Sequence, residues 1–412
     1  MMKFRALLLA SCLALLLPDG RAAAQTPNAP NPVRHVKVGV LTDMSGPISD
    51  VSGPGSVLAA QMAVEDYARA LLGDVTVEVV QADHQLKADV ATALARRWLD
   101  TDGVNAILDV PFSAAALAVN EVVRQNGHAA YLVSGGGTAD LTGAKCSPNT
   151  VHWTYDTWSV ANSTARAVVG QGGKSWFFLT SDYAFGHALE TDAARAIKAA
   201  GGQVLGTVTH PFNSPDMSAY VLQAMASKAQ VIGLANSSID AINSIKQARE
   251  LGAAAQGLRI AALIMLINDV HGLGLEAGQG LYLTEPFYWN LNERTRAFSD
   301  RFAARLGGRR PSMIQAGVYA SMIHYMKAVR AAGATDGLAV VAKMKELPTD
   351  DPLFGQGSIR VDGRALHDMH LFQVKTPAES KEPWDYYKLV ATTPAAEAFR
   401  PLPDGGCALV KG

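Results

Sequence analysis

Residues 35–47 read HVKVGVLTDMSGP, a run rich in β-branched residues that leads directly into a polar turn containing Gly and Pro. Helical spacing follows over residues 57–72, so the segment predicts the first strand–turn–helix unit of an open α/β sheet. Such sheets bind ligands at the carboxyl ends of their strands. The turn is therefore a candidate ligand-facing loop.

An export signal precedes this unit. Lys3 and Arg5 form a positive start, and residues 6–17 are apolar but too short to span a bilayer. The small residues 22–24 predict cleavage after Ala24, which makes residues 1–24 a signal peptide. Lipid attachment at Cys12 is the alternative, but the apolar run continues past that cysteine. Residues 25–35 predict a disordered leader, and the signal predicts that the mature chain is exported from the cytoplasm.

Length and charge limit the possible functions. Cleavage leaves 412 − 24 = 388 residues, which suits two lobes better than one core. The formal charge is −1 for the whole chain and −3 without the signal, whose net charge is +2. This mild value argues against nucleic acid as a partner. No later segment is long and apolar enough to span a membrane, so we expect a soluble mature chain.

Strands and helices alternate along the rest of the chain, as in doubly wound sheets. The first series has strands at 75–80, 106–110 and 130–133, and helices at 88–99 and 114–125. A crossing segment at 151–156 follows. The second series has strands at 176–179, 204–208, 231–234, 260–264 and 280–283, and helices at 159–170, 189–200, 217–227 and 241–251. Further helices are expected at 295–306, 316–332 and 338–347, then a hairpin-like pair at 357–361 and 370–374.

Two cysteines, Cys146 and Cys407, remain after the predicted cleavage. In an oxidising compartment they allow a single intramolecular disulfide. We expect this bond to tie the C-terminal tail to the first lobe, with two free thiols as the alternative.

The turns after the strands hold the candidate binding residues. Phe112 and Ser113 open a helix after an apolar strand, and Gly136, Gly137 and Thr138 follow the next strand. Helix N-termini, exposed amides and hydroxyls favour a carboxylate. The alternative for each motif alone is a helix cap or a tight turn.

The second series offers residues of another kind. Tyr183 and Phe185 follow one strand, Asn236 follows another, and the aromatic run 287–289 follows a third. Aromatic residues in turns indicate ring surfaces that close over a ligand. Packing at the hinge is the alternative for Tyr183 and Phe185, and some of the aromatic run must be structural.

The sequence gives little support for an enzyme active site or a metal site. The chain has no P-loop, no HExxH, no GxSxG and no dinucleotide-binding glycine pattern. His367 and His370 fall in an expected strand, where they would point to opposite faces. The alternative metal-binding pair is Asp269 and His271, which could coordinate a cation. We therefore expect no enzyme activity, no cofactor and no metal.

The chain resembles the type I periplasmic solute-binding proteins of ABC importers, in the branched-chain amino-acid and amide-binding branch. The resemblance extends from residue 36 to about 390. It depends on the order and spacing of GVLTDMSGP, DVPFSAAALAV, SGGGTADLTG, SDYAFGHALE, VIGLANSS and DPLFGQGSIRVDG. It implies two Rossmann-like lobes joined by three crossings, with residues 36–154 and 285–355 in one lobe and 155–284 and 356–412 in the other. The matched ligand positions are Val51 or Ser52, Phe112, Ser113, Gly136, Gly137, Thr138, Tyr183 or Phe185, and Asn236.

One departure from the family pattern concerns the ligand. Amino-acid binders of this family place a carboxylate against the ligand's ammonium, but residues 263–268 contain none. Either Asp269 or Glu285 takes that role, or the solute is not an α-amino acid. The departure favours an aromatic or aliphatic carboxylate or an amide.

The resemblance implies a monomeric solute-binding component that delivers its ligand to an ABC permease and its ATPase. The alternative is the same fold serving as a periplasmic sensor or receptor module.

Overall fold

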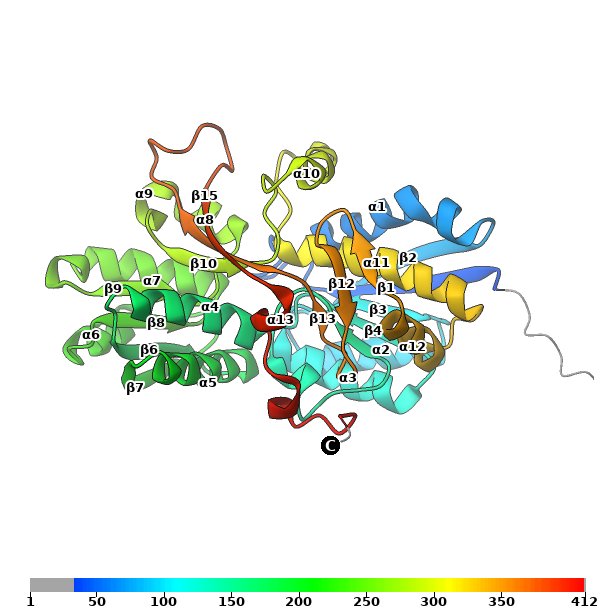
Figure 1. The fold of residues 1–412 in the computed structure, drawn as a ribbon, viewed down its shortest axis with the longest axis horizontal. Helices are drawn as coiled ribbons and strands as arrows, with labels where there is room; N and C mark the ends of the chain where they lie inside the picture. Colours follow the sequence, from blue (N-terminus) through cyan, green and yellow to red (C-terminus); the bar gives the residue numbers. More distant parts are fainter. Residues whose placement is uncertain (1–32, 411–412) are drawn as a thin grey trace, which may run out of the picture. The chain divides into compact units, whose positions relative to one another are not determined.

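The computed structural model describes residues 33–410, and Figure 1 shows their helices and strands. The predicted signal peptide, the alternative lipid site at Cys12 and most of the predicted leader lie outside the described residues. The first strand, β1, begins at His35, the residue at which that leader was expected to end. Among residues 33–410, no helix is long and apolar enough to cross a membrane.

The first lobe is built on a five-stranded parallel sheet with the order β2-β1-β3-β4-β5. Its strands are β1 His35–Thr42, β2 Thr76–Asp83, β3 Ala106–Asp109, β4 Ala130–Val133 and β5 Thr150–His152. Its helices are α1 Gly53–Leu72, α2 Ala88–Asp100, α3 Ser113–Asn126, the short η1 Ala139–Thr142, α10 Glu293–Arg305, α11 Met313–Ala332 and α12 Gly337–Glu346.

Alternation within β1 explains how the sheet acquires two covered faces. Val36, Val38 and Val40 are buried in the same core as α1 and α11, whereas Leu41 packs with α2 and α3. Gly39 is required because a Cβ atom there would lie 2.4 Å from the ring of Trp98. The opening stretch therefore specifies a strand buried on both sides.

The second lobe contains a four-stranded parallel sheet with the order β7-β6-β8-β9. Its strands are β6 Ser175–Ser181, β7 Gln203–His210, β8 Val231–Ala235 and β9 Arg259–Ala262. The helices are α4 Thr157–Gly170, α5 Ala184–Ala199, α6 Ser218–Ala226, α7 Ser238–Glu250, the short η2 Ala254–Gln256, α8 Ile267–Leu273 and α9 Leu275–Gly278. This lobe is green in Figure 1.

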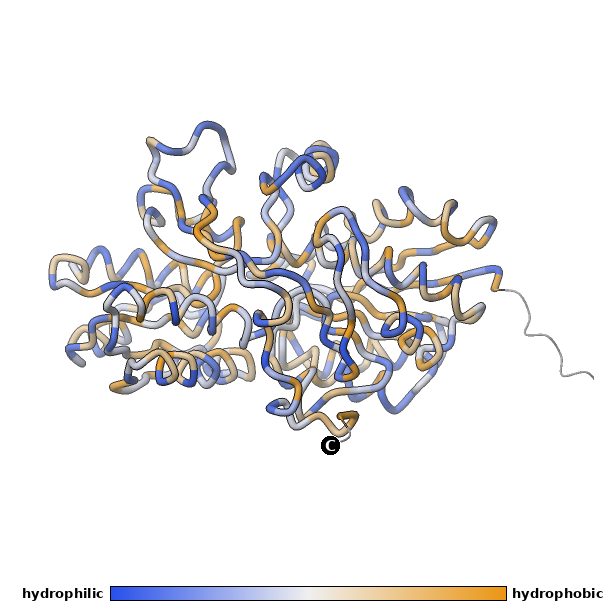
Figure 2. The backbone as a smooth tube through the Cα atoms, in the orientation of Figure 1, coloured by the Kyte–Doolittle hydropathy of each residue, from blue (hydrophilic) through white to orange (hydrophobic). Residues whose placement is uncertain are grey.

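A three-stranded antiparallel sheet carries the chain between the lobes. It consists of β10 Tyr282–Glu285, β14 Met369–Val374 and β15 Tyr387–Thr393, in the order β10-β14-β15. The predicted hairpin of 357–361 with 370–374 is therefore wrong. β12 Gly355–Ile359 pairs instead with β11 Thr349–Asp351 and β13 Ala365–Leu366, because the turn at Gly363 folds back at once. Figure 2 shows hydrophobic residues along the strands and a hydrophilic link over 375–386.

Residues 355–366 stay with the first lobe. The amide of His152 in β5 donates to the carbonyl of Gly363, and β12 contacts α12. The change of lobe expected at residue 356 therefore lies later, in the link between β13 and β14.

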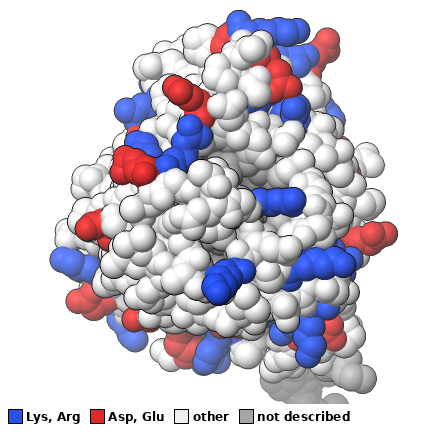
Figure 3. Space-filling view, turned by 90° about the vertical axis from the view of Figure 1, so that its left-hand side faces the viewer, with Lys and Arg blue, Asp and Glu red and all other residues white. Residues whose placement is uncertain are grey.

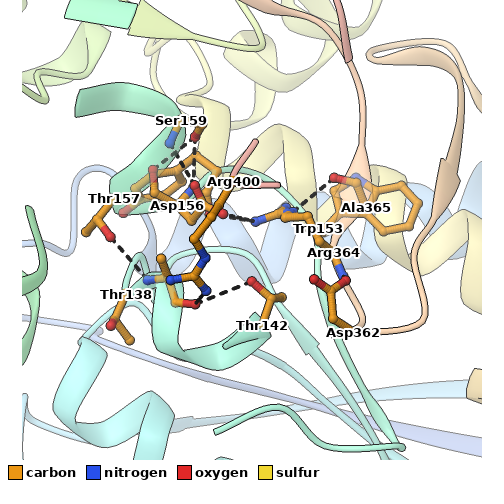
Figure 4. Close-up of polar contacts among 12 residues, drawn as sticks. Thr138, Thr142, Trp153, Asp156, Thr157, Ser159, Asp362, Arg364, Ala365 and Arg400 are labelled. Atoms are coloured by element: carbon orange, nitrogen blue, oxygen red, sulfur yellow. Dashed lines mark hydrogen bonds and ion pairs between the residues drawn. The ribbon is translucent and has the colours of Figure 1, made fainter. Parts of the chain in front are cut away.

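Arg364 is fully buried where the crossing segments meet (Figure 4). Its guanidinium lies 3.6 Å from the Asp156 carboxylate, donates to the carbonyl of Tyr155 at 3.0 Å, and covers the ring of Phe399 at 4.6 Å. The same Asp156 carboxylate accepts the amide of Ser159 and caps α4. One buried cation thus joins the start of α4, a second-lobe helix, to the turn between β12 and β13 of the first lobe.

The tail of the chain, with α13 Ala395–Ala398 and η3 Leu402–Gly405, ends against the first lobe. Arg400 donates to the carbonyl of Ala139 at 2.9 Å. Cys407 forms a disulfide with Cys146, with their Cα atoms 5.6 Å apart. We call residues 399–407 the C-terminal strap.

Candidate functional site

The turn after β3 places Phe112 and Ser113 at the start of α3. Asp109 and Val110 adopt positive φ angles of 78° and 53°, so the chain turns sharply from strand to helix without a glycine. Backbone strain of this kind concentrates at binding sites. Phe112 is the half-buried N-cap residue, and Ser113 is buried as the first residue of α3.

Two buried hydroxyls, those of Ser113 and Thr138, lie at the carboxyl ends of the strands of this sheet. The Ser113 hydroxyl accepts the amide of Thr138 at 3.2 Å, and the Thr138 hydroxyl accepts the amide of Asp140 at 3.4 Å. In the described part of the chain, neither hydroxyl donates its own proton to a protein acceptor. Both protons are therefore available to an incoming oxygen, and a carboxylate is the acceptor that gains most from them.

The glycines between these hydroxyls allow close packing of the backbone. A Cβ atom at Gly136 would lie 2.6 Å from Ala116, and one at Gly137 would lie 2.8 Å from the rings of Phe185 and Tyr155. Phe185 is a buried second-lobe residue. Its ring thus covers first-lobe backbone at Gly137, so these positions bring the lobes together.

Aromatic rings from both lobes form one cluster. Phe112 stacks on Tyr183 with ring centroids 4.9 Å apart, and Phe212 lies 5.6 Å from the first ring and 5.2 Å from the second. Burial raises the pKa of Tyr183 above its usual value, so its phenol stays protonated at neutral pH. The cluster provides ring surface beside the two free hydroxyls of the first lobe.

Asn236 follows β8 and is fully buried. Its amide nitrogen lies 3.0 Å from Nε2 of His210 and 3.3 Å from the Ser244 hydroxyl. Because Nδ1 of His210 lies 2.9 Å from the carbonyl of Pro211, the ring carries its proton on Nδ1 and accepts from Asn236 through Nε2. The Asn236 carbonyl oxygen has no partner among the described residues, so it can accept a donor from a solute.

Ser52 differs from the other predicted residues. It precedes α1, and its hydroxyl donates to the carbonyl of Ile48 at 2.9 Å. Its own carbonyl accepts the side-chain amide of Gln315. These bonds hold the loop between β1 and α1 against α11. The hydroxyl proton of Ser52 is already used in the bond to Ile48.

The model of the periplasmic binding protein family matches residues 35–381. The chain belongs to this family of periplasmic binding proteins. The two-lobed α/β fold expected from the resemblance is confirmed.

Similar periplasmic binding proteins include a solved one from Burkholderia mallei. It is 48% identical, with a TM-score of 0.88, covering 92% of this chain and 100% of that chain. A branched-chain amino-acid ABC transporter periplasmic ligand-binding protein from Burkholderia xenovorans is 39% identical, with a TM-score of 0.81, covering 91% and 99%. A Leu/Ile/Val-binding protein homologue from Brucella suis is 25% identical, covering 87% of this chain and 91% of that protein.

The two candidate acids of this periplasmic binding protein are buried. Asp269 accepts the amide of Leu266 at the start of α8, and burial raises its pKa to about 7. Glu285 accepts the phenol of Tyr387 at 3.0 Å, and burial together with the charge of Asp269 raises its pKa well above the usual value. Within residues 33–410 neither acid has a cationic partner. Burial therefore shifts both acids toward the protonated form.

Other predicted positions have packing roles. His367 precedes β14 and approaches the carbonyl of Trp153, while His370 lies in β14 beside Thr392. His271 stacks on Trp384 with ring centroids 4.0 Å apart. The described residues contain no group of three or more His, Cys, Asp or Glu side chains suited to a metal ion. The aromatic run 287–289 is buried throughout.

Sequence reasoning missed His210 and Phe212. Both lie at the carboxyl end of β7, where the strand-end rule that found Tyr183 and Asn236 also applies. The sequence His-Pro-Phe at 210–212 contained that signal.

Proposed function

We propose that this protein is the extracytoplasmic solute-binding component of an ABC importer. It would capture a small solute, a carboxylate or an amide, between its lobes and present the closed form to a permease and its ATPase. The export signal, with cleavage after Ala24, would deliver the mature chain to the periplasm. Family membership and the two-lobed fold support this role.

One observation carries the proposal for the solute. The hydroxyls of Ser113 and Thr138 retain their protons at the carboxyl end of the first sheet, next to the stacked rings of Phe112 and Tyr183. A carboxylate would accept both hydroxyl protons, while an apolar or aromatic body would pack on the rings. We propose that the neighbouring Gly136 and Gly137 also belong to this site, because their lack of a Cβ atom allows the backbone to pack closely there.

The buried acids favour a solute without an ammonium group. Asp269 and Glu285 both have raised pKa values, so each would have to give up its proton against the effect of burial before it could balance an ammonium. An ammonium buried without a counter-charge is costly. We therefore propose an aromatic or aliphatic carboxylate, or an amide, with an amino acid as the competing choice.

The test compares solutes that differ in one group. Residues 25–412 are refolded to remove any bound solute, and titration calorimetry is run with leucine and with 4-methylpentanoate, which lacks only the ammonium. Benzoate and benzamide form a second pair that differs in charge. Selective binding of 4-methylpentanoate or benzoate supports the proposal. Selective binding of leucine assigns Asp269 or Glu285 to the ammonium and overturns our choice of solute.

A further inference from the structure

The parallel sheet of the second lobe has one strand fewer than that of the first lobe. In the first lobe β5 pairs with the outer edge of β4, whereas in the second lobe β9 is the last strand. The next strand, β10, pairs with β14 instead. A groove of about 550 Å³ lies beside β9, lined by β9, residues 280–282 and the ends of α4 and α7.

The free edge of β9 supplies backbone polar groups to this groove. The amides of Arg259 and Leu263 donate to Gln230 and Leu234 on the β8 side. Successive residues of a strand point their peptide groups in opposite directions. The amide and carbonyl of Ile260, which lines the groove, therefore point away from β8.

The floor of the groove is apolar. Ile245, Leu258 and Leu281 line it together with Val168. Ile245 is 1% exposed and Leu258 is 9% exposed, so both belong to the packed interior of the lobe. The volume falls in the range of small-molecule sites, about 300–1,000 Å³.

Two arginines stand at the groove without carboxylate partners. Arg249 donates to the carbonyls of Glu276 and Ala277 at 3.0 and 3.3 Å, and Arg259 donates to the carbonyl of Gln171 at 2.9 Å. These bonds orient each guanidinium but leave its charge uncompensated. Within residues 33–410, no ion pair includes either arginine, and no acidic side chain lines the groove. Figure 3 looks onto this end of the second lobe; the central part of the face is largely uncharged with a few isolated Lys and Arg side chains, and acidic side chains lie mainly around its margin.

We propose that this groove is a second binding site, for a small apolar molecule with one carboxylate. The two oriented guanidinium groups attract the carboxylate, the edge amide of Ile260 can donate to it, and the apolar floor covers the hydrocarbon part. None of the residues predicted to bind the transported solute lines the groove. The site is therefore separate from the one between the lobes.

The test uses octanoate as the probe and octanol as its neutral counterpart. Methyl NMR spectra of Ile- and Leu-labelled protein report the groove through Ile245, Leu258 and Ile260. Octanoate should shift these signals saturably, and octanol should shift them far less. The double variant Arg249→Gln/Arg259→Gln should weaken octanoate binding about tenfold or more, since charge-assisted bonds are lost.

Arg69→Gln removes an exposed arginine of α1 that is remote from the groove, so it serves as the control. The proposal is overturned if octanoate leaves the groove signals unchanged at millimolar concentration. It is also overturned if the double variant binds as the wild type does, or if octanol binds equally well. Shifts confined to residues of the interlobe site would assign octanoate to that site and reject the groove.

Discussion

The ring of Phe112 lies face to face with that of Tyr183, with centroids 4.9 Å apart and planes inclined by 15°. Phe112 is the N-cap residue of α3 in the first lobe, and Tyr183 is the N-cap residue of α5 in the second lobe. The contact therefore exists only when the lobes are together. Such a pair contributes about 0.5–1.5 kcal/mol beyond its buried area, so it favours the closed form directly.

Removing either ring should weaken binding without unfolding the protein. We expect Phe112→Ala and Tyr183→Ala each to raise the Kd for the solute by roughly 2- to 10-fold, because the closed form loses this contact. Titration calorimetry measures the effect, and circular dichroism checks the fold. Tyr67→Ala, which removes a half-buried ring of α1, is the control. Normal binding by both ring variants would show that our placement of the site is wrong.

The hydroxyl of Ser113 should matter through its free proton. We expect Ser113→Ala to weaken binding of a carboxylate solute by about 10- to 100-fold, the value of one charge-assisted hydrogen bond. Ser52→Ala is the matched control, because that hydroxyl already donates to Ile48. This control should lower the melting temperature and leave the affinity nearly unchanged. Equal losses of affinity in the two variants would contradict the assignment.

The disulfide should stabilise the fold strongly, because it closes a loop of 261 residues. We expect Cys146→Ser/Cys407→Ser to lower the free energy of unfolding by about 2–5 kcal/mol. Urea unfolding with and without a reductant measures this. The reductant should destabilise the wild type to the level of the double variant and should not affect the variant itself. A wild type insensitive to full reduction would argue against this role.

The buried pair of Asp156 and Arg364 allows a test that keeps the helix cap. Asparagine caps helices as well as aspartate does, so Asp156→Asn removes mainly the charge beside Arg364. We expect a loss of about 3–5 kcal/mol in the free energy of unfolding, because the buried cation loses the one carboxylate that lies within 4 Å of it among the described residues. Arg364→Met/Asp156→Asn, which removes both charges, should recover part of that loss. If the double variant were less stable than the single one, charge pairing would not be the cause.

Asp269 should give stability a measurable pH dependence. Burial raises its pKa to about 7, against about 4 in an unfolded chain. Between these values the folded protein keeps a proton that the unfolded chain has lost, so its stability falls as pH rises. Relative to Asp269→Asn, the wild type should lose stability from about pH 4 to pH 7 and then level off. Parallel urea-unfolding profiles for the two proteins would contradict the raised pKa.

Much of the fold followed from local sequence patterns. The strand at 130–133 agrees with β4 at both ends, because an apolar run between polar turns has clear limits. The helix expected to begin at residue 189 begins at Ala184, since the turn-like Tyr183 is itself the N-cap. The helix α8 was missed because it has only seven residues, Ile267–Leu273, so the helical spacing of Ile267, Val270 and Leu273 covers too short a run to stand out.

The candidate site was less accessible to sequence reasoning. Local signals placed Phe112, Ser113 and Thr138 at strand ends, but which protons remain free depends on contacts between distant segments. The bond between Ser113 and Thr138 spans 25 residues, and that between Ser52 and Gln315 spans 263. The pairing of β14 with β10 and β15, likewise, is a choice among edges that no single strand encodes.

The C-terminal strap follows a second-lobe crossing, yet Arg400 and Cys407 fasten it to the first lobe. A fluorophore on the exposed Asp404 would therefore travel with the first lobe in the opening and closing that the proposed function requires. Combined with a second fluorophore on α6, it would convert the hinge motion into a change in energy transfer. The strap thus makes this end of the chain a convenient attachment point for a reagentless optical sensor of the solute.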